Sequence, residues 1–238
     1  MPLLFLSCDI IEGGGSDGSS SSSGKTESQK NGIVTFYTTY NEDSVAYYTP
    51  ELENDWYKCA VSENKLGEFP PQSAAKITHN GKTIRVLVTD LCPNAGNSQW
   101  TSKSNYFFDL AENAFAALDD KVKGHLDDVS IQRIAYETNK NIKFAVKEGS
   151  NQWWLAGRFY NMRYPLAKVE YSSNGSDFKE MKKLDGNKNN WWEIKSGENL
   201  MSNLTLRLTD VYGNMITCAA ISKLSVGGTY DLGANFNY

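Results

Sequence analysis

The stretch Thr83-Ile-Arg-Val-Leu-Val-Thr-Asp-Leu-Cys-Pro93 predicts a half-buried β-strand with a defined end. Apolar residues recur at every second position, which places Ile84, Val86 and Val88 on one face of the strand. Pro93 has no backbone N–H and cannot continue a central ladder, so Asp90-Leu-Cys-Pro93 is expected to end the strand of residues 83–89. The Asn80-Gly81 pair just before the strand favours a tight hairpin turn.

The segments around this strand predict a compact β-barrel with one helix. Residues 32–40 and 130–136 are rich in β-branched and aromatic side chains, which favour strands. Residues 109–118 place Leu110, Ala114, Phe115 and Leu118 along one helical face. Asp109 stands at the start of that helix with Glu112 three residues on, an arrangement typical of a helix cap. Folded structure is expected to begin near Gly32.

The second half of the chain predicts a small β-sandwich. Short segments of strand-forming residues alternate with turns rich in Gly, Asn and Asp, which is the pattern of such a fold. The expected strands are residues 141–146, 153–159, 166–171, 191–194 and 204–208.

Composition excludes several classes of protein. The 238 residues are 40% hydrophobic and 22% charged, which argues against collagen, a coiled coil and disorder over the full length. No apolar run approaches the roughly 20 residues of a membrane-spanning helix. The net charge of -4 argues against a nucleic-acid binder, and it divides into -8 over residues 1–138 and +4 over residues 139–238.

Cysteines and histidines offer little for metal or nucleophilic chemistry. The four cysteines lie far apart without a CxxC pair, so neither a zinc site nor another cofactor is expected. His79 and His125 stand in polar surroundings and are expected at the surface. A Ser-His-Asp or Cys-His mechanism therefore has almost no candidate residues.

The first 30 residues are expected to be a signal remnant followed by a linker. The apolar run before Cys8 is similar to the end of a bacterial lipoprotein signal, although it is short and has no preceding basic residue. The alternative is a disordered end with an incidental thiol. Residues 13–24 are nearly all Gly and Ser, which predicts a flexible tether. These features predict an extracellular protein, secreted or attached to a membrane through a lipid on Cys8.

Two sets of motifs resemble the expansin family, and bacterial expansins most of all. The barrel motif is Val88-Thr-Asp-Leu-Cys-Pro93 followed by Phe108-Asp-Leu110. In the second half the motifs are Val146-Lys-Glu-Gly-Ser-Asn-Gln-Trp-Trp154, Arg163-Tyr-Pro-Leu-Ala-Lys-Val-Glu-Tyr171 and Leu208-Thr-Asp-Val-Tyr-Gly213. The resemblance implies an all-β chain: a six-stranded double-psi β-barrel over residues 31–138, similar to family-45 endoglucanases, and an immunoglobulin-like cellulose-binding β-sandwich over residues 139–238. Expansins loosen plant cell walls without hydrolysing them.

The resemblance also implies a polysaccharide groove on the barrel. Its residues would be Thr35, Tyr37, Asp90 and Asp109, with Asp109 at the family's most sensitive acidic position. Each has a structural alternative: the helix cap for Asp109, a turn before Pro93 for Asp90, and ordinary packing for Thr35 and Tyr37. The last two are two residues apart and share a face on a regular strand.

Two residues depart from the family pattern. Cys92 replaces the Tyr that is frequent in bacterial members, and Phe107 replaces the His of the plant His-Phe-Asp motif. Both changes are expected to alter what the groove contacts. In an oxidising compartment a Cys59–Cys92 disulfide is conceivable, with Cys218 left free.

The expected groove favours binding over cleavage. An inverting glycosidase needs an acid and a base whose carboxyl groups lie roughly 6.5–9.5 Å apart. Residues 32–40 contain no carboxylate, and Glu42 and Asp43 fall in the turn that follows. A lone acid can grip a sugar hydroxyl without cutting the chain, although a lytic transglycosylase could also work with one carboxylate.

Tryptophans give the clearest signal of binding in the second half. Trp153-Trp154 and Trp191-Trp192 can stack on the apolar faces of glucose rings, and the resemblance places Lys147 beside this platform. Gly186 stands where the family has a third aromatic residue. Neighbouring residues of a strand face opposite sides, so the alternative is one core and one surface Trp in each pair, which we favour for Trp191-Trp192.

These observations lead to one hypothesis and two alternatives. The chain is expected to be a monomeric, non-hydrolytic protein that binds cellulose and matrix polysaccharides, and the basic second half also suits pectin. The alternatives are a glycan-cleaving enzyme, either a β-1,4-glucanase or a transglycosylase, and a pure carbohydrate-binding adhesion module.

Overall fold

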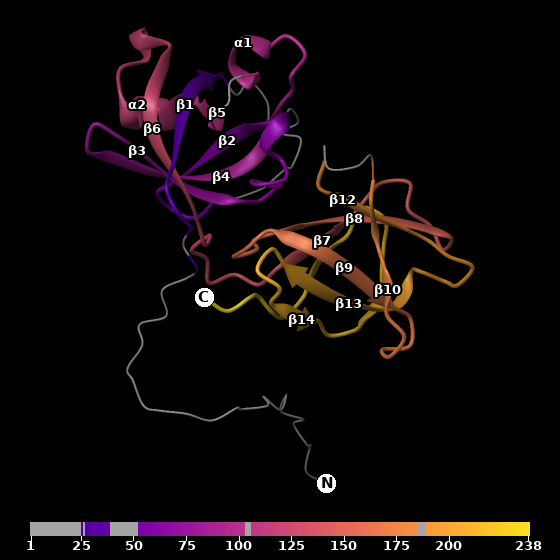
Figure 1. Cartoon of the computed structure of the whole chain (residues 1–238). Helices are drawn as coiled ribbons and strands as arrows, with labels where there is room; N and C mark the ends of the chain where they lie inside the picture. The colour runs from indigo at the N-terminus through magenta and orange to yellow at the C-terminus, as the bar shows by residue number, and fades with distance from the viewer. Residues whose placement is uncertain (1–24, 26, 39–51, 103–105, 185–188) are drawn as a thin grey trace, which may run out of the picture.

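The computed structural model describes residues 25, 27–38, 52–102, 106–184 and 189–238. Figure 1 shows two β-rich bodies, with strands β1–β6 in the first and β7–β10 and β12–β14 among those of the second. The predictions for Cys8, for the Gly/Ser tether, for Glu42 and Asp43 and for Gly186 lie outside the described residues. No helix among the described residues is long and apolar enough to cross a membrane.

Six strands close the first body into a barrel. In chain order they are β1 (Lys30–Tyr37), β2 (Trp56–Ser62), β3 (Ala74–His79), β4 (Lys82–Cys92), β5 (Tyr106–Ala111) and β6 (His125–Ile134). Around the barrel the order is β1-β5-β2-β4-β3-β6. The pairs β1–β5 and β2–β4 are parallel, and the other pairs are antiparallel.

Short helices connect these strands. They are η2 (Glu63–Lys65), α1 (Ser98–Thr101), α2 (Glu112–Leu118) and η3 (Lys121–Lys123). Helix α2 packs Phe115 and Leu118 into the barrel core, beside Val34, Val88 and Phe108. Asn80 and Gly81 both have positive φ, 46° and 77°, as a hairpin turn of this kind requires. The predicted turn and the strand before Pro93 are therefore confirmed, and β4 continues past the predicted Thr89 to Cys92.

The predicted helix start at Asp109 is wrong. Asp109 lies in β5, which pairs with β1 and β2, and α2 begins only at Glu112. The residue before the helix is Ala111, and no side chain caps it. Pairing with β2 reaches Leu110 and pairing with β1 extends the strand to Ala111, so tertiary contacts override the helical spacing of Leu110 and Ala114.

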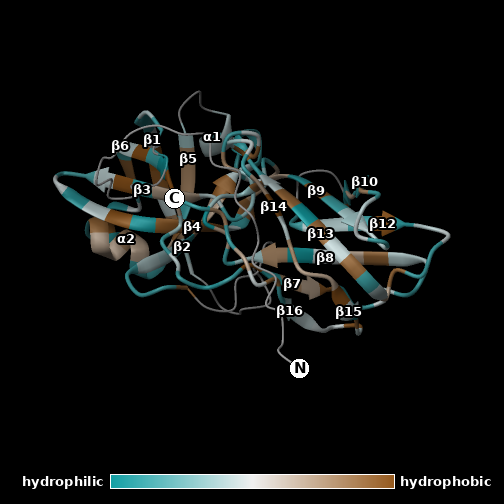
Figure 2. Cartoon of the chain, turned by 90° about the horizontal axis from the view of Figure 1, so that it is seen from below, coloured by the Kyte–Doolittle hydropathy of each residue, from teal (hydrophilic) through white to brown (hydrophobic). Residues whose placement is uncertain are grey.

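The second body is a sandwich of two sheets. One sheet has the order β10-β9-β13-β14 with β15 beside β13, and the other has the order β11-β12-β8-β7-β16. The strands are β7 (Lys143–Val146), β8 (Trp154–Tyr160), β9 (Leu166–Ser172), β10 (Lys179–Glu180), β11 (Lys182–Lys183), β12 (Trp191–Lys195), β13 (Ser202–Asp210), β14 (Met215–Thr217), β15 (Ile221–Lys223) and β16 (Thr229–Asp231). Figure 2 shows hydrophobic and hydrophilic residues alternating along strands such as β9 and β13. The predicted fold class, a six-stranded barrel followed by a β-sandwich, is confirmed.

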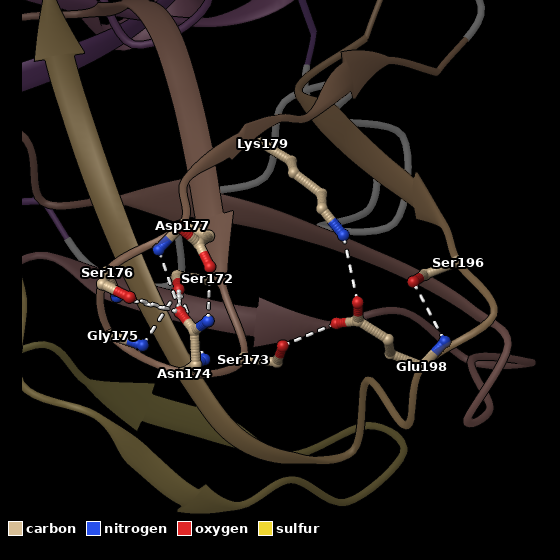
Figure 3. A network of polar contacts seen from close by, with 9 residues as sticks. All are labelled: Ser172, Ser173, Asn174, Gly175, Ser176, Asp177, Lys179, Ser196 and Glu198. Atoms are coloured by element: carbon tan, nitrogen blue, oxygen red, sulfur yellow. Dashed lines mark hydrogen bonds and ion pairs between the residues drawn. The ribbon is translucent and has the colours of Figure 1, made fainter.

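A polar network fixes one end of the sandwich (Figure 3). The Asn174 side-chain oxygen accepts hydrogen bonds from the backbone N–H groups of Ser176 and Asp177, each at 2.9 Å. Glu198, in the turn after β12, accepts from Ser173 at 2.6 Å and pairs with Lys179 at 3.1 Å. The turn between β9 and β10 is thereby joined to the turn between β12 and β13.

Hydrogen bonds also join the two bodies. Arg133 at the end of β6 forms an ion pair with Glu27, and Tyr212 of the sandwich donates to the same carboxylate at 3.4 Å. The Lys25 backbone N–H donates to the Tyr164 hydroxyl at 2.8 Å. The chain just before β1 therefore contacts both bodies. The domain boundary that we predict at residues 138/139 falls in the segment between β6 and β7.

Candidate functional sites

A row of polar side chains crosses the outside of the barrel. The strand register sets Thr35 of β1 opposite Asp109 of β5, Asp109 opposite Ala60 of β2, and Ala60 opposite Asp90 of β4. Directly paired residues project to the same face of a sheet. The chain neighbours of these residues, such as Val34 and Phe108, are buried in the barrel core. The row therefore faces outward and brings together three of the predicted groove residues.

Asp109 is held in an environment that favours its neutral form. Burial raises the pKa of this carboxyl, and the negative charge of Asp90 raises it further. The Thr35 hydroxyl donates a hydrogen bond to Asp109 Oδ1 at 2.5 Å, which opposes the rise because it stabilises the charged form. A carboxyl group in this balance can both donate to and accept from a sugar hydroxyl.

Tyr37 adds a hydroxyl donor on the same face. It follows Thr35 by two residues, and its buried hydroxyl has no hydrogen-bond partner among the described residues. Burial and the charge of Asp90 raise the pKa of Tyr37, so the hydroxyl stays protonated. An unpaired buried hydroxyl costs about 1–3 kcal/mol, so Tyr37 is held in this groove wall against a local cost in stability.

An apolar cluster lies beside the polar row. Ile33, Ala60, Cys92 and Phe107 are buried together, with Tyr37 and Trp100 packed against them. The two residues that depart from the family pattern, Cys92 and Phe107, are thus both in the groove wall. Sequence reasoning did not find Trp100, which stands in the four-residue helix α1; an isolated aromatic residue in a polar loop was the only signal.

The conceivable Cys59–Cys92 disulfide is not formed. Cys59, Cys92 and Cys218 are all free thiols. Cys59 pairs with Val88, whereas Cys92 pairs with Ser62, three residues further along β2. Three residues of a strand span about 10 Å, beyond the roughly 7 Å limit between the Cα atoms of a disulfide. Cys59 also faces the barrel core, whereas Cys92 faces the groove wall.

The second site is an aromatic surface on the sandwich sheet that contains β8 and β12. The register sets Trp154 opposite Lys195, Ala156 opposite Glu193, and Arg158 opposite Trp191. These residues share the outer face of the sheet, because the alternating residues Leu155 and Phe159 are in the core. Trp153, in the turn just before β8, is 54% exposed.

Charged groups hold the aromatic rings of this surface. Glu193 accepts a hydrogen bond from the Trp154 indole N–H at 2.8 Å. The Arg158 guanidinium lies 4.6 Å from the centre of the Trp191 ring, and Lys147 Nζ lies 5.3 Å from it. The structure therefore brings Trp153, Trp154, Trp191 and Lys147 to one sheet, together with Arg158 and Glu193, which sequence reasoning did not find.

Trp192 does not belong to the aromatic surface, so its prediction as a binding residue is wrong. It is 3% exposed and lies in the sandwich core, because it follows Trp191 on a regular strand and points to the other face. The division into one core and one surface Trp that we favour for this pair is what the structure has. Lys183 covers the Trp192 ring at 4.4 Å, and burial lowers the pKa of its amine to about 8.

Comparisons with known proteins point to one family. No family model matches the chain. Expansin-YoaJ of Bacillus subtilis is 30% identical over 63% of this chain and 57% of its own length. Expansin-like protein 1 of Dictyostelium discoideum is 26% identical over 55% of this chain and 41% of its own length. The chain thus spans about half the length of the curated relatives that it matches, and the predicted resemblance to expansins is confirmed.

Solved structures show the same two-body fold. A mutant of the Clavibacter michiganensis expansin, in complex with cellohexaose, superposes with a TM-score of 0.71 at 21% identity. The apo form of that expansin gives the same TM-score at 22% identity. Each comparison covers 87% of this chain and 98% of the other. At this level of identity the likeness establishes the fold of the barrel and the sandwich.

Proposed function

We propose that the chain is an expansin-like protein that binds cellulose and plant cell-wall matrix polysaccharides and loosens the non-covalent contacts between glucan chains without hydrolysing them. The observation that carries the proposal is the outward row of Thr35, Asp109, Ala60 and Asp90, in which burial raises the pKa of the Asp109 carboxyl. Likeness to expansins in sequence and fold supports it.

The aromatic surface would adsorb the protein to cellulose. Indole faces stack on the apolar faces of pyranose rings, and Trp153, Trp154 and Trp191 present large aromatic surfaces for that contact. The charged groups around them, Glu193 and Lys147 among others, can exchange hydrogen bonds with equatorial hydroxyls. Lys147 and Arg158 would also attract uronates, which extends the range to anionic wall polymers such as pectin.

The groove would act on a single glucan chain. Asp109 can replace a hydrogen bond that a glucan hydroxyl makes with a neighbouring chain. The exchange needs no covalent step, because each broken contact between chains is matched by a contact with the protein. A chain held in this way is released from its neighbours and can slide under load.

Cleavage is the second candidate, and Asp90 is the observation in its favour. Two strand spacings separate Asp109 from Asp90, about 10 Å between Cα atoms. This is close to the carboxyl separation of an inverting glycosidase. An inverting mechanism would need the glucan to lie between these two carboxyl groups, with the acid and the base on opposite sides of the scissile bond.

One incubation tests both candidates. The full chain is mixed with microcrystalline cellulose for a day, and the supernatant is assayed for remaining protein and for new reducing ends. Loss of protein without release of sugar is the expected result. Reducing ends that appear with the native protein and disappear with Asp109→Asn would establish cleavage and refute the non-hydrolytic proposal.

Two variants then separate loosening from adhesion. Native protein should increase the creep of heat-inactivated plant walls under constant load. Asp109→Ala removes the group that exchanges hydrogen bonds with the glucan and should abolish creep while leaving adsorption unchanged, whereas the double variant Trp153→Ala/Trp154→Ala should lose adsorption. Adsorption without creep by the native protein would identify an adhesion module instead.

Location and assembly are part of the same proposal. A protein that acts on a cell wall must leave the cell, and the apolar run before Cys8 is consistent with export and with a lipid tether at that cysteine. We propose that the chain works as an extracellular monomer. Mass spectrometry of protein from its native membrane fraction would show a diacylglycerol adduct on Cys8 if the tether exists.

A further inference from the structure

The polar row of the barrel extends to a fifth strand. His125, the first residue of β6, pairs with Thr35 of β1. The row therefore runs His125, Thr35, Asp109, Ala60, Asp90 across five adjacent strands. Four strand spacings amount to about 19 Å, and His125 stands at the end opposite Asp90.

An aromatic pair stands at this end of the row. The Trp100 ring of α1 lies 5.1 Å from the His125 ring, with the two planes at 47°. Trp100 is also nearly parallel to the buried ring of Phe107, at 6.1 Å and 9°. The Phe107 ring therefore packs against the indole and fixes its plane. Trp100 remains partly exposed.

Polar groups surround the aromatic pair as a sugar site requires. The exposed His125 side chain is 3.4 Å from Asp127, and Thr35 is its neighbour in the row. A pyranose ring presents an apolar face of C–H groups and a rim of hydroxyls, which match an indole face and such polar neighbours. A flat hydrophobic ligand would gain nothing from the polar neighbours, and a purely polar ligand would gain nothing from the indole.

We propose that Trp100 and His125 form an aromatic subsite at the β6 end of the groove, where one pyranose ring of a bound glucan stacks. The proposal rests on the proposed function of the groove and adds the direction in which the bound glucan chain lies. The glucan runs along the row, and the ring stacked on Trp100 sets which hydroxyls reach Asp109. Phe107 contributes by supporting the indole.

The test is a titration of the ¹⁵N-labelled full chain with cellohexaose, followed by NMR. The backbone amide signals of Thr35 and Asp109 report the groove, and the signal of Trp153 reports the aromatic surface of the sandwich. Trp100→Ala should weaken the affinity read from the groove signals by about tenfold, the contact of one aromatic ring. The affinity read from Trp153 should stay unchanged.

Further variants guard against local unfolding. Trp100→Phe keeps an aromatic ring packed against Phe107 and should lose less affinity for cellohexaose than Trp100→Ala. His125→Ala should lose an amount of affinity between those of the two Trp100 variants. Val122→Ala is the matched control, because Val122 is 90% exposed on the same body and should not change the affinity. Groove signals that respond to cellohexaose with equal affinity in native protein and Trp100→Ala would overturn the subsite and leave the groove intact. Groove signals that do not respond even in the native protein would refute the groove function and the subsite with it.

Discussion

Thr35→Val should raise the pKa of Asp109 further, and Asp90→Asn should lower it. Valine keeps the shape of threonine but removes the hydroxyl that donates to Asp109 Oδ1 at 2.5 Å. A hydrogen bond to a charged group contributes about 1.5–3 kcal/mol, and about 1.4 kcal/mol changes an equilibrium tenfold. Thr35→Val should therefore favour the neutral form of Asp109 by at least about tenfold relative to the native protein.

Asp90→Asn should shift the pKa of Asp109 downward, and by less than Thr35→Val shifts it upward. Asp90→Asn removes one negative charge at about 10 Å, which amounts to about 1.7 kcal/mol at an effective dielectric constant of about 20. Without that charge the ionised form of Asp109 is less penalised, so the pKa falls. The Thr35 hydrogen bond acts on the pKa of Asp109 more strongly than the Asp90 charge, so the effect of Thr35→Val should exceed that of Asp90→Asn.

Carboxyl ¹³C shifts recorded against pH measure the pKa of Asp109 directly. Thr78→Val is the matched control, because Thr78 lies on β3 and shares its hydrogen bond with Thr83 rather than with an acid. If neutral Asp109 is the active form, wall creep by Thr35→Val should persist to higher pH than creep by the native protein. A pKa of Asp109 that falls or does not move in Thr35→Val would refute the reasoning.

The remaining predictions concern the sandwich. Arg207 donates two hydrogen bonds to Glu170, at 2.7 and 2.8 Å, and lowers the pKa of Glu170 to about 2. The pair therefore stabilises the fold at pH values above the ordinary pKa of glutamate. This stability should be lost as the pH falls from about 4.5 towards 2. Thermal unfolding against pH should show this loss in the native protein and a flatter profile in Glu170→Gln. Gly157→Ala should cost about 1–3 kcal/mol, since its new methyl group would lie 2.1 Å from the Phe144 ring, whereas Gly67→Ala meets nothing within 4 Å and should be close to neutral in a urea titration. Trp192→Ala should cost about 3–5 kcal/mol of stability, because Trp192 is buried in the core. Trp191→Ala should weaken adsorption to cellulose with little loss of stability. Equal effects of the two variants on adsorption would contradict their assignment to opposite faces of the sheet.

Local chemistry explains the parts that the sequence predicts well. Pro93 ends β4 because it has no N–H to donate, and Asn80-Gly81 adopts the positive φ angles that a tight turn needs. The separation of Trp191 from Trp192 follows from the two-residue period of a strand. None of these conclusions depends on which distant segment lies alongside.

The errors arise where distant segments decide the structure. Residues 109–118 have a helical spacing of apolar side chains, yet the first three residues form a strand because β1 and β2 flank them. Strands β2 and β3 are not predicted from the sequence. Lys58 and Lys76 stand among the apolar residues of these strands, so the alternation of apolar and polar side chains is weak. Trp100 and His125 meet only because α1 folds over the start of β6.

The position of Asp90 in the groove depends on one irregularity that the string Val88-Thr-Asp90 does not reveal. Cys59 pairs with Val88 but Ala60 pairs with Asp90, so β4 carries one extra residue, Thr89, in its pairing with β2. On a regular strand Thr89 would follow the buried Val88 onto the outer face and Asp90 would point inward. Instead Thr89 is fully buried, its hydroxyl has no hydrogen-bond partner among the described residues, and Asp90 joins the row.

A bulge in a parallel pair is rare, and an unpaired hydroxyl costs stability, so the arrangement is maintained against a local free-energy cost. Bulges that re-aim a side chain are concentrated beside functional sites, which makes the placement of Asp90 an independent argument that this face of the barrel is the working one.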